Sequence, residues 1–129
     1  MDRIARPAFG LVLAAVIAPV VVAAGAAPHW LSFPADAPLH ARLTLLPRQG
    51  EVGRDNPVFQ GYAPELVFGP GSHGASCRLD LGGNDAQLAP GETRTVGLDC
   101  FEALKVRDDQ LTFTAFEGGR KVGEGVLTR

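Results

Sequence analysis

The sequence predicts an all-β fold, a six-stranded antiparallel Greek-key barrel. Beyond residue 40, no segment shows the spacing of apolar residues that marks an amphipathic helix. Short apolar runs are instead separated by Gly, Pro, Asn and Asp, which is typical of strands joined by tight turns. Six short strands of this kind fit a closed barrel, because closure removes exposed sheet edges.

The chain begins with a leader. Residues 8–28 carry no charged side chain, and Arg3 and Arg6 precede them with only Asp2 opposing. A short basic head, an apolar stretch and small residues near its end are typical of a secretory signal. We therefore expect the rest of the chain to be exported.

The end of the leader leaves alternatives open. Ala24-Gly25-Ala26 resembles a cleavage site, which predicts loss of residues 1–26. The apolar run is about 20 residues long, so an uncleaved membrane anchor is the rival interpretation, although Pro19 interrupts it. A buried cytoplasmic helix is the third. The first two place the domain in the periplasm, outside the cell, or on the inner membrane facing outward, because the basic head stays inside.

Residues 27–40 form the next segment, and its prolines are Pro28, Pro34 and Pro38. Prolines at this density exclude a helix, so we expect an extended linker or strap lying on the domain. The side chains expected to pack onto the barrel surface are His29, Trp30 and Phe33.

The barrel is expected over residues 41–129. Its predicted strands are residues 41–46, 65–68, 76–81, 93–100, 110–116 and 121–128. In the fifth of these, Leu111, Phe113 and Ala115 share one face by period-two alternation; the other face is formed by Thr112, Thr114 and Phe116.

Glycine-rich turns separate these strands. Residues 82–85 and Pro90-Gly91 are turn sequences on the N-terminal side of the fourth strand. Gly118-Gly119 predicts a two-residue hairpin loop between the last two strands, of the type that needs positive φ.

Charge argues against a nucleic-acid-binding module. Without the leader about 100 residues remain, enough for one small domain. Removing Arg3, Arg6 and Asp2 leaves 10 basic and 13 acidic residues, a formal charge of −3. Modules that bind nucleic acid usually carry a basic excess, because much of their affinity comes from neutralised phosphates.

Cys77 and Cys100 are the two cysteines of the chain. An even count in an exported protein favours a disulfide, whereas in a cytosolic protein two buried thiols would be expected. The leader therefore predicts the Cys77–Cys100 bridge. Their wide spacing, without a C-x-x-C pair or paired histidines, does not fit a zinc site.

Five short segments of the predicted barrel carry an ordered set of motifs. They are residues 42–46 (RLTLL), 53–59 (GRDNPVF), 61–65 (GYAPE), 90–92 (PGE) and 117–126 (EGGRKVGEGV). In the same order and at similar spacing, they resemble the first strand and the G-R-H-T-P-F-F, G-Y-R-P-Q, P-G-D and E-G-G-R-T-V-G-A-G-V motifs of the C-terminal domain of the elongation factor Tu family. The resemblance covers residues 41–128 and implies a six-stranded antiparallel barrel.

The resemblance also implies candidate binding residues. In that family the domain contacts the T-stem of aminoacyl-tRNA and a GTPase domain. The candidate positions here are Arg54, Glu65, Glu117, Gly118 and Arg120. If they have no binding role, Arg54 and Arg120 are expected to be solvated or to form ion pairs within the barrel. Tyr62 and Phe59 are expected in the core or against the strap.

The residues at the family's RNA-facing positions have changed. Asp55 stands where the family has His, Ala63 where it has Arg, and Glu65 where it has Gln. A carboxylate offers no hydrogen-bond donor to phosphate and repels it. We therefore expect this domain to bind tRNA weakly or not at all.

The sequence contains no recognisable catalytic motif. It lacks the G-x-x-x-x-G-K-[ST] loop of GTPases, a G-x-S-x-G elbow and an H-E-x-x-H pair, and Asp108-Asp109 is a turn pair. We expect no enzymatic activity, no cofactor and no metal. The first hypothesis is a non-enzymatic binding module of the cell envelope with a protein partner and, if the leader persists, a membrane tether through residues 8–28. The alternative is a translation-factor-like module that binds tRNA or an elongation factor, which requires that the leader is not an export signal.

Overall fold

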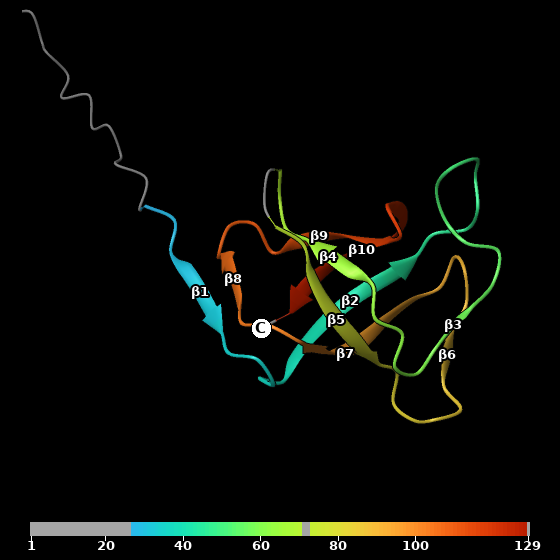
Figure 1. The fold of residues 1–129 in the computed structure, drawn as a ribbon, viewed down its shortest axis with the longest axis horizontal. Coiled ribbons are helices and arrows are strands. Elements are labelled where there is room, and N and C mark those ends of the chain that lie inside the picture. Colours follow the sequence, from blue (N-terminus) through green and yellow to red (C-terminus); the bar gives the residue numbers. More distant parts are fainter. Residues whose placement is uncertain (1–26, 71–72, 129) are drawn as a thin grey trace, which may run out of the picture.

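The structure is a computed structural model that describes residues 27–70 and 73–128. These residues form an all-β fold, as predicted (Figure 1). Within them, no helix has the length and apolar character needed to cross a membrane. The predicted leader, residues 1–26, lies outside the described part of the chain.

Six strands close into an antiparallel barrel in the order β10-β2-β7-β5-β4-β9. The strands are β2 (Leu39–Leu45), β4 (Glu65–Val67), β5 (Ala75–Asp80), β7 (Thr93–Cys100), β9 (Thr112–Glu117) and β10 (Arg120–Thr128). The first barrel strand, β2, pairs with β7 and β10 and not with β4, the next barrel strand in sequence. This long return gives the barrel its Greek-key connection.

All six predicted barrel strands are present, with small differences at their ends. Strand β2 begins at Leu39, so His40 lies inside it and not before it, because Leu39 and His40 pair with Leu98 and Gly97 of β7. The other shifts are of one or two residues, and strand ends are the positions at which local sequence patterns are least informative.

Four short strands outside the barrel were not predicted. Strands β1 (Trp30–Phe33) and β8 (Leu104–Arg107) pair with each other, as do β3 (Val58–Phe59) and β6 (Gln87–Leu88). The strap over residues 27–40 thus contributes a strand of its own. The two ribbons lie at opposite ends of the molecule, β1–β8 at the left of Figure 1 and β3–β6 at the right.

The core is filled by apolar side chains that alternate along the barrel strands. In β2 the inward residues are Leu39, Ala41, Leu43 and Leu45, all of them buried. In β9, Phe113 and Ala115 are buried while Thr112 is exposed, which confirms the predicted alternation. The described residues bury no polar or charged side chain.

The turns form where glycine was predicted to permit them. Gly118 and Gly119 have φ of 55° and 82°, and they link β9 to β10 through a two-residue hairpin loop. Gly91 has φ of 87°, and the Glu92 amide donates to the Ala89 carbonyl oxygen over 3.0 Å across the predicted Pro90-Gly91 turn. Both positive-φ conformations cost little for glycine because it lacks a Cβ.

Strand β10 contains a glycine required by packing. A Cβ on Gly125 would lie 2.3 Å from Cζ of Phe113 and 2.8 Å from the carbonyl oxygen of Arg42. The Phe113 ring occupies this space and packs against Phe68, with ring centroids 5.2 Å apart. The glycine therefore makes room for an aromatic residue in the core.

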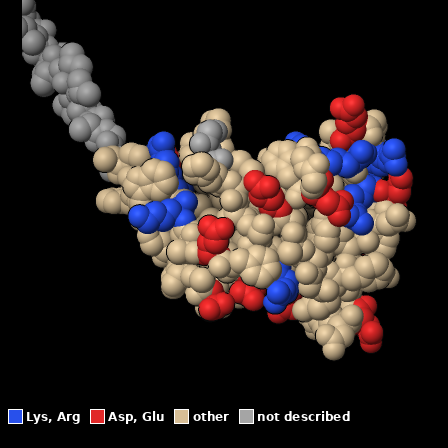
Figure 2. Space-filling view, viewed as in Figure 1, with Lys and Arg blue, Asp and Glu red and all other residues tan. Residues whose placement is uncertain are grey.

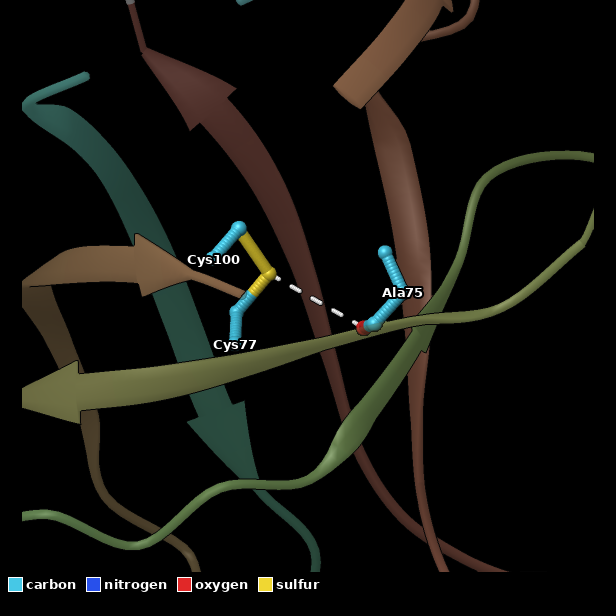
Figure 3. The surroundings of a disulfide bond; sticks show 3 residues. All are labelled: Ala75, Cys77 and Cys100. Atoms are coloured by element: carbon cyan, nitrogen blue, oxygen red, sulfur yellow. Dashed lines mark hydrogen bonds between the residues drawn. A yellow bond between two sulfur atoms is a disulfide. The ribbon is translucent and has the colours of Figure 1, made fainter. Parts of the chain in front are cut away.

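The predicted disulfide between Cys77 and Cys100 is present, joining β5 to β7 inside the barrel (Figure 3). The two residues are direct cross-strand partners whose Cα atoms lie 3.9 Å apart, which is below the limit of about 7 Å for a bridge and also shorter than the usual range of about 4.4–6.8 Å. Both side chains are buried. The dashed line in Figure 3 joins Cys77 Sγ to the Ala75 carbonyl oxygen over 3.8 Å, and it marks a packing contact because a disulfide sulfur has no proton to donate.

Candidate functional site

The candidate site lies at the right-hand end of the barrel in Figure 1, where the chain leaves β2 and where the β9–β10 hairpin turns. We call this region the loop end and define it as residues 47–62 together with residues 117–120. It holds most of the candidate binding residues.

The first loop of this region folds back on itself and is tied to the barrel. Pro47 bridges to Arg54, and the Arg54 amide donates to the Leu46 carbonyl oxygen over 2.9 Å. The Gly53 amide donates to the Lys121 carbonyl oxygen over 2.8 Å. Gly53 has φ of 86°, and a Cβ there would lie 2.0 Å from the Pro47 carbonyl oxygen, so the close turn needs glycine. The backbone that carries Arg54 is thereby held in place.

Arg120 holds the hairpin against this loop. Its Nε donates to the Gly53 carbonyl oxygen over 2.7 Å, and its Nη2 donates to the Gly50 carbonyl oxygen over 2.8 Å. A guanidinium has five N–H donors in a fixed plane, which suits it to bridging several carbonyl groups. At least two of the Arg120 donors therefore serve the loop backbone.

Arg54 and Glu117 form the centre of the loop end. Arg54 Nη1 lies 2.5 Å from both carboxylate oxygens of Glu117, and Arg54 Nε donates to the Asn56 carbonyl oxygen over 3.3 Å. The Arg54 side chain is 21% exposed and that of Glu117 is 45% exposed. The Arg54 guanidinium also lies over the Tyr62 ring, with Cζ 5.2 Å from the ring centroid, which is cation–π distance.

The ring of Tyr62 lies beneath the Arg54 guanidinium in this cluster. Its hydroxyl is buried and makes no hydrogen bond of ordinary geometry with any described residue. Burial of the phenol raises the pKa of Tyr62 to about 12; the Glu117 charge adds to this rise and the Arg54 charge opposes it. Tyr62 is therefore neutral over the physiological pH range.

Two hollows flank the Arg54–Glu117 pair. One, of about 270 Å³, has Arg48, Asp55 and Arg120 in its lining, and Arg48 Nη1 donates to Asp55 Oδ2 over 3.0 Å. The other, of about 400 Å³, runs along residues 56–62. Figure 2 shows basic and acidic side chains side by side at this end of the molecule, so its charges are mixed.

Exposed apolar side chains border the same cluster. Phe59 is 59% exposed and Val52 is 38% exposed. The expectation that Phe59 belongs to the core or the strap contact is wrong, because Val58 takes the inward position in β3 and period-two alternation turns Phe59 outward. Tyr62 packs against the core, which is one of the two positions expected for it.

The structure brings together three of the five candidate binding residues in contact with one loop: Arg54, Glu117 and Arg120. Gly118 lies beside them at the hairpin tip, where a Cβ would meet nothing within 4 Å. Glu65 lies apart in β4, where its carboxylate covers Gly74. The expected ion pair within the barrel is confirmed for Arg54, which pairs with Glu117. Sequence reasoning missed the contact of Tyr62 with Arg54; the G-Y-A-P-E motif marked the residue but not its neighbour.

Another hollow, of about 730 Å³, lies elsewhere, on the outer wall of the barrel. Its lining is mainly threonine and apolar side chains, with Arg42 and Glu124 as its charged groups. Glu124 pairs with Lys121 over 2.5 Å. Since no described residue there forms a nucleophile–base pair or a cluster of charges, we place the candidate site at the loop end.

Within residues 27–70 and 73–128, no three His, Cys, Asp or Glu side chains gather as a metal-binding group. The Asp108-Asp109 pair forms a turn, as predicted, and Asp109 accepts hydrogen bonds from Arg107 over 3.1 and 2.9 Å. The site geometry therefore consists of ion pairs, a buried phenol and exposed apolar side chains. A scan against models of known protein families finds none that matches this chain.

Proposed function

We propose that this protein is a non-enzymatic binding module of the cell envelope, built on a barrel of the elongation factor Tu C-terminal type, and that its partner is a protein held at the loop end. The observation that carries the proposal is the stack of Arg54 on Tyr62 beside the exposed Phe59. Arg, Tyr and Phe are enriched in protein interfaces, and Tyr and Arg are enriched among the residues that dominate binding energy.

Binding fits the loop end better than catalysis does. Most charged groups there already engage one another or the backbone: Glu117 with Arg54, Asp55 with Arg48, and Arg120 with loop carbonyl groups. General acid–base catalysis favours a group whose pKa lies near the working pH, whereas the pKa of Tyr62 is about 12. These contacts rigidify a surface, and rigid surfaces lose less entropy on binding.

Two observations support a location outside the cytoplasm. The leader has the composition of a secretory signal or an anchor. The buried Cys77–Cys100 disulfide is compatible with an oxidising compartment, because structural disulfides are rare in reducing cytosol.

The geometry gives less support to the tRNA-binding alternative. Of the three arginines of the loop end, Arg120 donates to loop carbonyl groups, and Arg48 and Arg54 are each paired with a carboxylate. Binding to phosphate would require each to leave its partner, and that partner would then repel the RNA backbone. A protein partner with mixed charge meets no such penalty.

Photo-crosslinking in cells tests the proposal. A photoreactive residue at position 59 of the full chain should give a discrete protein adduct, while the same residue at position 95, exposed on the barrel wall, should give none. Arg54→Ala should reduce the yield of the adduct at position 59, and it should change the melting temperature of the protein by no more than a few degrees. Equal adducts at both positions, or none at position 59, would contradict the proposal. An adduct sensitive to ribonuclease would instead support the translation-factor alternative.

Cell fractionation tests the location separately. A C-terminally tagged chain should be found outside the cytoplasm, either processed before Ala27 or full-length in the membrane. Full-length protein in the soluble cytoplasm would overturn the envelope location and favour the translation-factor alternative.

A further inference from the structure

We propose that the outer face of the β1–β8 ribbon docks on the surface of a zwitterionic lipid bilayer, with Trp30 as its anchor. This inference rests on the envelope location in the proposed function. It concerns the end of the molecule opposite the loop end, and it requires the leader to stay attached as an anchor.

The ribbon has two distinct faces. Leu104 and Val106 of β8 are buried, and Leu31 and Phe33 of β1 pack against the core cluster. Trp30 lies opposite Arg107 in the pairing register, and Ser32 lies opposite Lys105. Cross-strand partners project from the same face of a ribbon, so these four residues form an outer face that turns away from the core.

Trp30 is exposed to an extent that packing does not explain. It is the single tryptophan of the chain, and it is 64% exposed. Tryptophan side chains are buried on average. They are also enriched at membrane–water interfaces, because the ring can lie in apolar surroundings while the indole N–H reaches water. The barrel closes without β1, so the barrel itself does not require the ring.

Covalent geometry places Trp30 at the end of the leader. The uncharged run ends at Pro28, and His29 is the residue between them. Two extended residues span at most about 7 Å. If residues 8–28 lie in a bilayer, Trp30 is therefore held at the level of the headgroups, where its exposed side chain can contact lipid.

The charge of the ribbon selects the type of lipid. The outer face carries two basic side chains, Lys105 and Arg107, and residues 102–109, which include β8, also carry three acidic side chains. Arg107 is paired with Asp109, with Nη2 to Oδ2 at 2.9 Å. Anionic membranes attract clusters of about four to eight basic residues, and the two on this face, one of them paired, do not form such a cluster. We therefore assign a zwitterionic surface, which Trp30 contacts through its apolar ring.

Space beside the indole fits this contact. A hollow of about 370 Å³ is lined by Trp30, Phe68, Pro70 and Val106 and also by Lys105, Arg107 and Gln110. Its apolar wall can receive part of a lipid acyl chain near the headgroup. Docking through this face leaves the loop end, at the other end of the molecule, directed away from the membrane (Figure 1).

Tryptophan fluorescence of the full chain in phosphatidylcholine vesicles tests the proposal, because emission comes from Trp30 alone. Trp30 emission should shift to shorter wavelength, and lipids brominated near the headgroup should quench it at least about twofold. Raising the salt to several times the physiological concentration should change the quenching by less than about twofold, since screening weakens only charge attraction.

A matched variant moves the reporter to the loop end. Trp30→Phe combined with Phe59→Trp places the one tryptophan at a position of similar exposure, and its emission should stay aqueous and unquenched. Equal quenching of the two reporters, or an unquenched Trp30 in vesicle-bound full chain, would overturn the docking. Finding only chains processed before Ala27 in cells would overturn it too. Each of these outcomes leaves the crosslink at position 59, and so the proposed function, separately testable.

Discussion

One guanidinium at the loop end serves two side chains, since Arg54 pairs with Glu117 and covers Tyr62. The pair is partly exposed, and exposed ion pairs contribute only about 0.2–1 kcal/mol to stability. Its main effect is therefore geometric: it keeps the arginine over the ring and the carboxylate beside the buried hydroxyl.

Tyr62 offers a direct test of this cluster, because it is the only tyrosine in the chain. Its pKa of about 12 is raised from 10.0 by burial and by Glu117. Glu117→Gln should lower the Tyr62 pKa in a titration of tyrosinate absorbance. Glu102→Gln, which removes an exposed carboxylate between β7 and β8, should leave it unchanged. An equal shift in both variants would mean that Glu117 does not act locally.

The same pKa predicts a limit to alkaline stability. A phenol whose pKa is raised by folding stabilises the native state fully below its unfolded pKa of about 10, and this contribution is lost as pH rises through the folded pKa of about 12. The free energy of unfolding of the wild type, measured with urea, should therefore decrease above pH 10. Tyr62→Phe should reduce this alkaline loss, and an unchanged pH profile would contradict the assignment.

The Cys77–Cys100 disulfide is expected to contribute strongly to the stability of the fold. Cys77 and Cys100 are separated by 23 residues, and closing a loop of this length contributes about 3 kcal/mol in the chain-entropy model. The double change Cys77→Ala and Cys100→Ala should lower the free energy of unfolding by about that amount, measured by urea denaturation. Thiol labelling of the unreduced wild type after unfolding in urea should find no free thiol; labelling of both cysteines would show that the bridge is absent.

At the level of elements, strand β10 depends on small residues where it crosses the core. Gly125→Ala should lower the free energy of unfolding by about 1–3 kcal/mol, because its methyl group would overlap Phe113 and the Arg42 carbonyl. Gly83→Ala is the matched control, since a Cβ there meets nothing within 4 Å and the backbone has no positive φ. Thermal melts of the two variants that coincide would contradict this packing argument.

The ribbons at the two ends of the barrel serve a different purpose from the barrel strands. Each contains two strands of two to four residues, too short to be independently stable, so each depends on the barrel beside it. In β1–β8 and in β3–β6 an exposed aromatic residue, Trp30 or Phe59, lies next to an inward-facing one, the partly buried Leu31 or the buried Val58. The ribbons thus expose apolar side chains, whereas the apolar side chains of the barrel strands are mostly buried in the core.

For the whole molecule, net charge and local pairing predict weak tRNA binding. With a formal charge of −3 after the leader, and with Arg48 and Arg54 paired to carboxylates, titration with aminoacyl-tRNA at about 150 mM salt should show affinity no tighter than about 10⁻⁴ M. Asp55→His releases Arg48 and removes one repulsive charge, so it should raise the affinity, with a gain that shrinks as salt rises. Submicromolar binding by the wild type, abolished by Arg54→Ala, would contradict the envelope-module proposal.

The all-β class, the six barrel strands, the hairpin at Gly118-Gly119 and the Cys77–Cys100 pairing could be predicted from the sequence alone. Period-two alternation and positive-φ glycines are local signals, so the strand over residues 110–116 and the turn at residues 118–119 could be predicted without reference to the rest of the chain. The disulfide followed from having two cysteines in adjacent predicted strands behind a leader.

Tertiary structure alone decided the ribbons and the make-up of the candidate site. Trp30 meets Arg107, and Arg54 meets Glu117 and Tyr62, across long separations in sequence. No local pattern reports such contacts, because they depend on the barrel closing and on which strand ends then lie side by side. For the same reason the sequence grouped Glu65 with the loop end, whereas its register in β4, opposite Phe116, turns it onto Gly74 and away from Arg54.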